Sequence, residues 1–155
     1  MKSNLTMFLA LISFLALAPI SFAGGVRNNI DPNPNFQRIM KSVTRIVIRD
    51  GGDICCVSKA DTLKQKVFVE ITAKEEIADF AEHIVFKKGT SINECFCCGR
   101  PGLDLYAGKK RVFFSGIKHG SGLMKEARIA WFTPKSKQWL HAWLINHGLP
   151  EDQIK

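Results

Sequence analysis

Five cysteines fall in two short groups, and this clustering is the feature of the sequence that most directly suggests chemistry. The first group is Cys55 and Cys56, and the second is Cys95, Cys97 and Cys98. In an oxidising compartment such thiols form disulfides, and adjacent cysteines bridge each other only with strain. We therefore expect one or two bridges between the groups, which leaves at least one cysteine free or paired with another molecule.

A metal site is the alternative interpretation of the same residues. Cys95, Cys97 and His119 combine thiolate and imidazole ligands, which zinc and copper bind. A fourth ligand would come from another cysteine or, for copper(I), from the thioether of Met124. The C-x-C-C spacing differs from the C-x-x-C pair typical of zinc sites. We therefore prefer the disulfide and expect no cofactor, with zinc or copper as the alternative.

His119 differs from the other histidines because it lies in a glycine-containing loop, residues 118–122, at the end of a predicted strand. Loops of this kind often carry functional groups. His83, His141 and His147 lie in predicted helices, and the last two are six residues apart, so they do not share a helix face as a ligand pair would. We expect these three at the surface or at its boundary.

An organised catalytic set is not visible in the sequence. A reactive cysteine needs a lowered thiol pKa, for which the neighbouring cation Arg100 is the main candidate cause. The carboxylates belong to a helix start, a turn or, for Asp104, the exposed face of a strand. No G-x-S-x-G, H-E-x-x-H, P-loop or dinucleotide motif occurs. We therefore expect that the protein is not an enzyme. A catalytic site assembled from scattered residues around His119 is the alternative.

The strands that would position these residues are indicated by β-branched runs and by turn residues. A hairpin is predicted over residues 43–49 and 54–57, with a turn at 50–53. Another strand is predicted at 67–71. A second hairpin is predicted over 103–117, and a last strand, over 126–132, follows a glycine-containing loop.

Two helices complete the predicted elements. Thr72 and Glu75 match a capping box that opens a helix over residues 73–88, with an apolar stripe on one side. Thr133 caps a second helix that starts at Pro134 and ends at Gly148. Hairpins outnumber β-α-β units, so the sequence predicts an α+β domain in which a largely antiparallel sheet carries two helices packed on one face.

The N-terminus has the layout of an export signal. Lys2 precedes an apolar run over residues 5–20, and small residues at 21 and 23 predict cleavage before Gly24. A retained membrane anchor is the alternative, because the run approaches spanning length. We expect a signal peptide at 1–23, a flexible lead-in at 24–35, a single domain at 36–150 and a tail at 151–155. The mature chain would then be periplasmic or secreted and have no membrane span.

The net charge of the chain indicates which kinds of partner it would attract. The chain has a formal net charge of +8, and removal of Lys2 with the signal leaves 21 basic and 14 acidic residues. Such a surplus favours acidic partners by long-range attraction. The cations are spread along the chain without a dense basic tract, so we expect a solvated surface and no nucleic acid. The sequence favours another protein as the partner and leaves the oligomeric state open.

From Cys95 to Gly148 the chain resembles a set of small, uncharacterised bacterial proteins. The resemblance rests on residues 95–99 (C-F-C-C-G), the strand pair over 103–117, the H-G-S loop at 119–121 and a closing helix that contains tryptophan. Those proteins carry a C-x-C-x-G segment and a His-His-Gly loop, whereas Lys118 precedes the histidine here. The resemblance implies a fold and assigns no activity.

Small size, export and the lack of a catalytic motif together favour a non-catalytic binding protein of the bacterial envelope. It would act as an inhibitor, an immunity-type protector or an accessory factor. The alternative is a metal-binding or thiol-redox protein that uses Cys95, Cys97, Cys98 and His119.

Overall fold

The computed structural model describes residues 30–52, 63–92, 99–126 and 128–154. These residues form three α-helices, seven strands and a short 3-10 helix. The helices are α1 (Asn33–Met40), α3 (Lys74–His83), α4 (Pro134–Asn146) and the 3-10 helix η1 (Glu151–Ile154). The strands are β1 (Arg45–Arg49), β2 (Val67–Ile71), β3 (Ser91–Ile92), β4 (Gly102–Ala107), β5 (Lys110–Lys118), β6 (Gly122–Lys125) and β7 (Arg128–Trp131). The predicted α+β class is confirmed, with three helices in the described residues where two were predicted.

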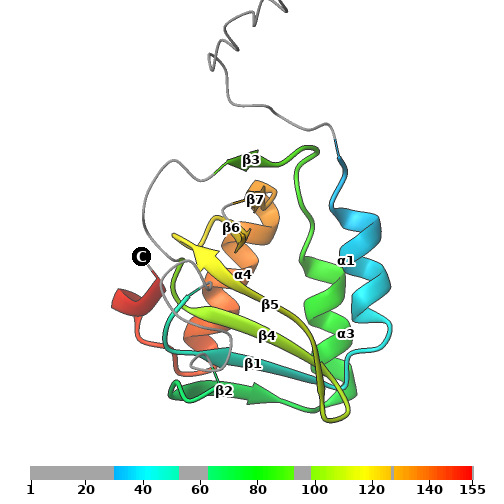
Figure 1. The fold of residues 1–155 in the computed structure, drawn as a ribbon. Coiled ribbons are helices and arrows are strands. Elements are labelled where there is room, and N and C mark those ends of the chain that lie inside the picture. The colour runs from blue at the N-terminus through cyan, green and yellow to red at the C-terminus, as the bar shows by residue number, and fades with distance from the viewer. Residues whose placement is uncertain (1–29, 53–62, 93–98, 127, 155) are drawn as a thin grey trace, which may run out of the picture.

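The strands form one sheet in the order β2-β1-β4-β5-β6-β7-β3, and every neighbouring pair is antiparallel (Figure 1). Alternation along the strands separates two faces. Ile46 and Ile48 lie opposite Leu105 and Leu103, and all four side chains are buried in one hydrophobic cluster. This register defines the apolar face of the sheet.

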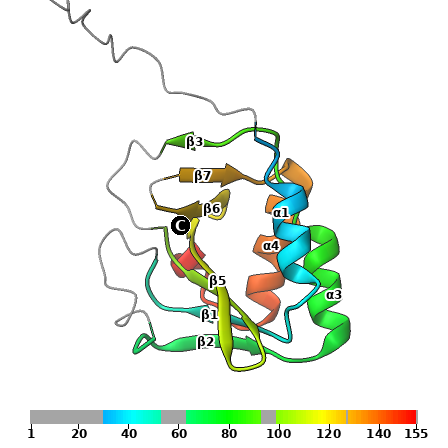
Figure 2. The ribbon, with the colours of Figure 1, turned by 45° about the vertical axis from the view of Figure 1, so that its right-hand side comes forward.

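The three helices cover that apolar face (Figure 2). Each contributes to the same core: α1 through Phe36 and Met40, α3 through Phe80, and α4 through Leu140 and Leu144. The core also takes in Leu149, from the loop after α4, and Ile154, from η1. The packed unit therefore begins within the expected lead-in and extends into the expected tail.

The opposite face of the sheet holds a buried ionic cluster. Asp104 pairs with Val47 across β1 and β4, one position away from the apolar set. Its Oδ2 accepts from Arg49 Nε at 3.1 Å and from Arg111 Nη1 at 3.2 Å. Arg49 is 2% exposed and Asp104 is 1% exposed. The prediction that Asp104 lies on an exposed strand face is therefore wrong, because both faces of β4 are covered.

The helix predicted over 73–88 is confirmed at its start but ends early. The helix α3 stops at His83, and Ile84 is already extended. Beyond it, the backbone N–H groups donate to distant partners: Val85 to Ser136 Oγ, Phe86 to the side chain of Asn33, and Lys87 to the carbonyl oxygen of Trp131. These tertiary bonds replace the helical ones. The capping box is also wrong, because the N-cap is Ala73 and no side chain caps the helix.

Other elements differ from prediction in similar ways. The strand predicted over 126–132 corresponds to β7, and part of the loop predicted before it is a strand, β6. The helix α1 and the short strand β3 were not predicted. The strand β2 and the helix α4 with its Thr133 cap are confirmed. The returning strand predicted at 54–57 lies outside the described residues. Among the described helices, none has the length and apolar character needed to cross a bilayer.

The ionic cluster leads to a first prediction. Asp104→Asn would leave the guanidinium groups of Arg49 and Arg111 without their shared carboxylate. Because an uncompensated buried charge is costly, we expect the free energy of unfolding to fall by about 3–5 kcal/mol. Glu70→Gln is the control, since it removes the partly exposed pair with Arg45 and should cost less than about 1 kcal/mol. Urea unfolding followed by tryptophan fluorescence measures both losses, and equal values would contradict this assignment.

Candidate functional site: a groove beside the first helix

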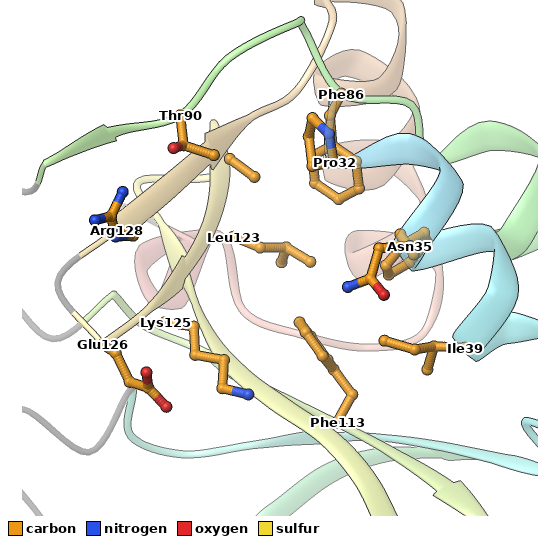
Figure 3. A pocket seen from close by; sticks show the side chains of 12 residues that line it. Pro32, Asn35, Ile39, Phe86, Thr90, Phe113, Leu123, Lys125, Glu126 and Arg128 are labelled. Carbon is orange, nitrogen blue, oxygen red and sulfur yellow. The ribbon is translucent and has the colours of Figure 1, made fainter. Parts of the chain in front are cut away.

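A groove of about 330 Å³ lies between α1 and the strands β5, β6 and β7 (Figure 3). It is lined by Pro32, Asn35, Phe36, Ile39, Phe86, Thr90, Phe113, Leu123, Lys125, Glu126, Arg128 and Ala130. Apolar side chains predominate, and a few polar groups accompany them. Binding sites for small apolar groups typically have this composition and a volume of this order.

One wall of the groove is α1, which the side chain of Asn33 ties to the rest of the fold. Its Nδ2 donates to the carbonyl oxygen of Phe86 at 2.9 Å, and its Oδ1 accepts from the backbone N–H of Phe86 at 2.7 Å. The amide thus satisfies both backbone groups of Phe86, as a neighbouring strand would. Gln37 adds a bond from Nε2 to the carbonyl oxygen of Ala81 at 2.7 Å.

Asp31 in turn holds Asn33. Its Oδ1 accepts from the backbone N–H of Asn33 at 2.9 Å and from Asn33 Nδ2 at 2.7 Å. Both bonds keep the pKa of the Asp31 carboxyl below its ordinary value, and the bond from the backbone N–H of Asn33 has the larger effect. The start of α1 is therefore fixed by side chains that come before and within its first turn.

Aromatic rings form the interior of the groove. Phe36 meets the ring of Phe86 edge-on at a centroid distance of 5.2 Å, and the ring of Phe113 at 6.3 Å. Phe36 and Phe86 are buried, whereas Ile39, Phe113 and Ala130 pack against the core and remain partly exposed. The groove is therefore a place where the apolar face of the sheet is incompletely covered.

Charged residues of β6, β7 and the turn between them stand at one side of the groove. Lys125 Nζ lies 5.7 Å from the ring centroid of Phe113 and 5.2 Å from that of Phe114. Arg128 is exposed, and it has no ion-pair partner in the described part of the chain. Glu126 lies in the turn with a φ of 51°. In Figure 3 its carboxylate is directed away from the middle of the groove.

Of the residues singled out from the sequence, His119 and Met124 are described and do not line this groove. The disulfide and metal candidates Cys55, Cys56, Cys95, Cys97 and Cys98 all lie outside the described residues. In the described ranges, no group of three or more His, Cys, Asp or Glu side chains is arranged to hold a metal ion.

His119 lies exposed in the turn between β5 and β6, with a φ of 47°. The Ser121 hydroxyl donates to its carbonyl oxygen at 2.9 Å. Gly99, which directly follows the second cysteine group, packs on the neighbouring part of β5. A Cβ at Gly99 would lie 3.2 Å from the carbonyl carbon of Gly116 and 3.3 Å from the nitrogen of Lys118. Gly99 therefore lies close to the backbone that leads into His119.

Two of the three other histidines pack against tryptophan. His83 stacks on Trp139 at a centroid distance of 4.7 Å, and His147 lies 4.2 Å from Trp143. His141 is exposed on α4. These positions agree with the surface or boundary role expected for the three residues.

The groove itself was missed at the level of sequence because its wall, α1, was missed. The spacing of Phe36, Ile39 and Met40 matches one face of a helix and could have indicated α1. Lys125 and Arg128 were seen only as members of a dispersed set of cations. Their position beside the groove depends on the turn between β6 and β7. The sequence predicted a loop over the residues of β6 and a strand over 126–132, so this turn was not predicted.

Comparison with known proteins gives no match to a family model, to a curated protein or to a solved structure. The geometry of the described residues alone therefore defines this candidate site.

The anchoring of α1 gives a second prediction. Asn33→Ala leaves the N–H and the carbonyl group of Phe86 without these partners, so we expect the free energy of unfolding to fall by about 1–3 kcal/mol. Asn35→Ala is the control, because Asn35 accepts only an exposed bond from Arg38, and the change should stay within about 0.5 kcal/mol. Urea unfolding compares the two. A loss for the Asn33 variant no larger than the control's would show that this contact does not hold α1.

Proposed function

We propose that the mature chain is a non-catalytic binding protein of the bacterial envelope, which holds a protein partner at the groove between α1 and β5–β7. The observation that carries the proposal is the partly exposed apolar surface that Ile39, Phe113 and Ala130 present together in the groove. Apolar surface at a concave site is typical of a binding surface. An inhibitor, an immunity-type protector or an accessory factor would use such a site.

The envelope location in this proposal depends on the export signal at residues 1–23. A periplasmic or secreted location supplies the oxidising conditions in which cysteines form bridges. The excess of 21 basic over 14 acidic residues in the mature chain supports an acidic partner, since long-range attraction raises the rate of encounter. Nucleic acid is not part of the proposal.

The described residues that flank the two cysteine groups support a bridge between the groups. Gly52 accepts from Arg49 Nη1 at 3.1 Å, and Arg49 lies opposite Gly102 in the sheet. Gly102 lies opposite Gly116, on which Gly99 packs. Cys55 comes three residues after Gly52, and Cys98 directly precedes Gly99. Gly52 and Gly99, the described residues nearest to the two groups in the sequence, therefore lie at the same end of β1, β4 and β5.

A metal-binding or thiol-redox protein is the second candidate function. The packing of Gly99 beside the backbone nitrogen of Lys118 supports it, because Gly99 directly follows Cys98 in the sequence and Lys118 directly precedes His119. Zinc or copper would bind Cys95, Cys97 and His119, with thiolate and imidazole as ligands that suit both metals.

A third prediction tests the binding function. The mature domain, immobilised and exposed to envelope extract, should retain one dominant protein. Ile39→Ser removes apolar surface from the groove and should lower the apparent affinity for that protein about tenfold, as expected for an apolar contact at a binding centre. Ile145→Ser, at an exposed position of α4, is the control and should leave affinity unchanged. Equal retention by the two variants, both shown to be folded, would contradict binding at the groove.

A fourth prediction separates the two candidate functions. If the cysteine groups are bridged, denatured mature protein should show one free thiol for two bridges or three for one bridge, out of five cysteines. Elemental analysis should then find no stoichiometric zinc or copper. Metal at one equivalent, lost on Cys97→Ser together with a full set of free thiols, would instead favour the metal-binding function.

A further inference from the structure

Lys125 and Arg128 lie beside the apolar groove, and among the described residues no carboxylate faces them across it. Lys125 Nζ approaches the ring faces of Phe113 and Phe114, at 5.7 and 5.2 Å from the centroids. Arg128 is exposed and makes no ion pair with any residue that the structure describes. The one carboxylate of the lining, Glu126, is directed away from the groove (Figure 3). The groove is thus apolar inside and positively charged along one side.

The apolar interior is suited to a ring. The edge-to-face contacts of Phe36 with Phe86 and Phe113 form a small aromatic cluster, and the rings of such clusters attract further rings through their edges and faces. The volume of about 330 Å³ accommodates one aromatic or long aliphatic side chain together with an adjoining polar group. It does not extend to the size expected for a large cofactor.

We propose that the groove recognises an aromatic side chain that lies next to a carboxylate, as presented by an acidic segment of a partner protein. The ring packs among Phe36, Phe86 and Phe113, and the carboxylate faces Lys125 and Arg128. This inference rests on the proposed function and defines the chemistry of the partner. Charge complementarity at the side of the groove selects an acidic segment over a neutral one of the same shape.

The test uses two small probes with the same apolar body. Hydrocinnamate carries a phenyl ring and a carboxylate, and hydrocinnamamide carries the ring and a neutral amide. Amide NMR spectra of the mature domain, recorded during titration with each probe, give the site of binding and the dissociation constant. For ligands of this size we expect dissociation constants in the millimolar range.

The expected result is saturable shifts at residues 32–39, 86–90 and 123–130, with hydrocinnamate bound at least about fivefold more tightly than hydrocinnamamide. The difference should narrow as NaCl is raised from about 0.05 M to about 0.5 M, because salt screens exposed charges. Equal affinity for the two probes, shifts confined to other surfaces, or no binding of either probe would overturn the inference.

Substitutions of Lys125 and Arg128 test whether these two cations cause the preference for hydrocinnamate. Lys125→Gln combined with Arg128→Gln should reduce the preference for hydrocinnamate to less than about twofold and leave the binding of hydrocinnamamide unchanged. Lys109→Gln combined with Lys110→Gln, two exposed positions where β4 turns into β5, removes the same number of charges and should leave the preference intact. A loss of preference in the control as well would show that overall charge, and not the groove, selects the acid.

The outcome also separates this inference from the function on which it rests. If Ile39→Ser weakens retention of the protein partner while the two probes bind equally, the groove is a binding site for a partner of other chemistry, and this inference alone fails. If Ile39→Ser has no effect on retention and the probes shift no groove residue, the proposed function and this inference fail together.

Discussion

The structure depends on one constraint: the apolar face of the seven-stranded sheet must be covered, and helices from both ends of the described chain cover it. The helices α3 and α4 pack together over one part of this face through Phe80, Trp139 and Trp143. The helix α1 is only eight residues long and is held by the bonds of Asn33 to Phe86. A groove remains where this short helix meets β5–β7, so incomplete coverage and the candidate site have the same cause.

The two faces of the sheet carry different features. The face away from the helices buries Asp104 with Arg49 and Arg111, a pairing that is costly to disturb because the charges cannot return to water. Gly52 and Gly99, the described residues next to the two cysteine groups, lie at the end of the sheet where Arg49 of β1 pairs with Gly102 of β4. The ionic cluster and the groove therefore lie on opposite faces of the same sheet.

The sequence predicted the elements that local patterns determine. The strand β2 has the predicted bounds because β-branched residues and the flanking turn are local features, and α4 is marked by Thr133 and Pro134 at its start. The early end of α3 depends instead on bonds between residues about fifty positions apart, such as Val85 with Ser136 and Phe86 with Asn33. Asp104 was misplaced for a related reason, since strand alternation cannot tell a solvent-facing side from a second buried one. The groove could not be predicted because it joins α1 to β6 and β7.

The most direct test of the central claim is NMR chemical-shift mapping of the mature domain bound to the partner retained from envelope extract. The account predicts that the shifts concentrate in residues 32–39 of α1, in 86–90 and in the β6–β7 hairpin, while the outer residues of α4 are unchanged. Shifts confined to α4 or to the outer edge of β2, with α1 and the hairpin unaffected, would contradict it.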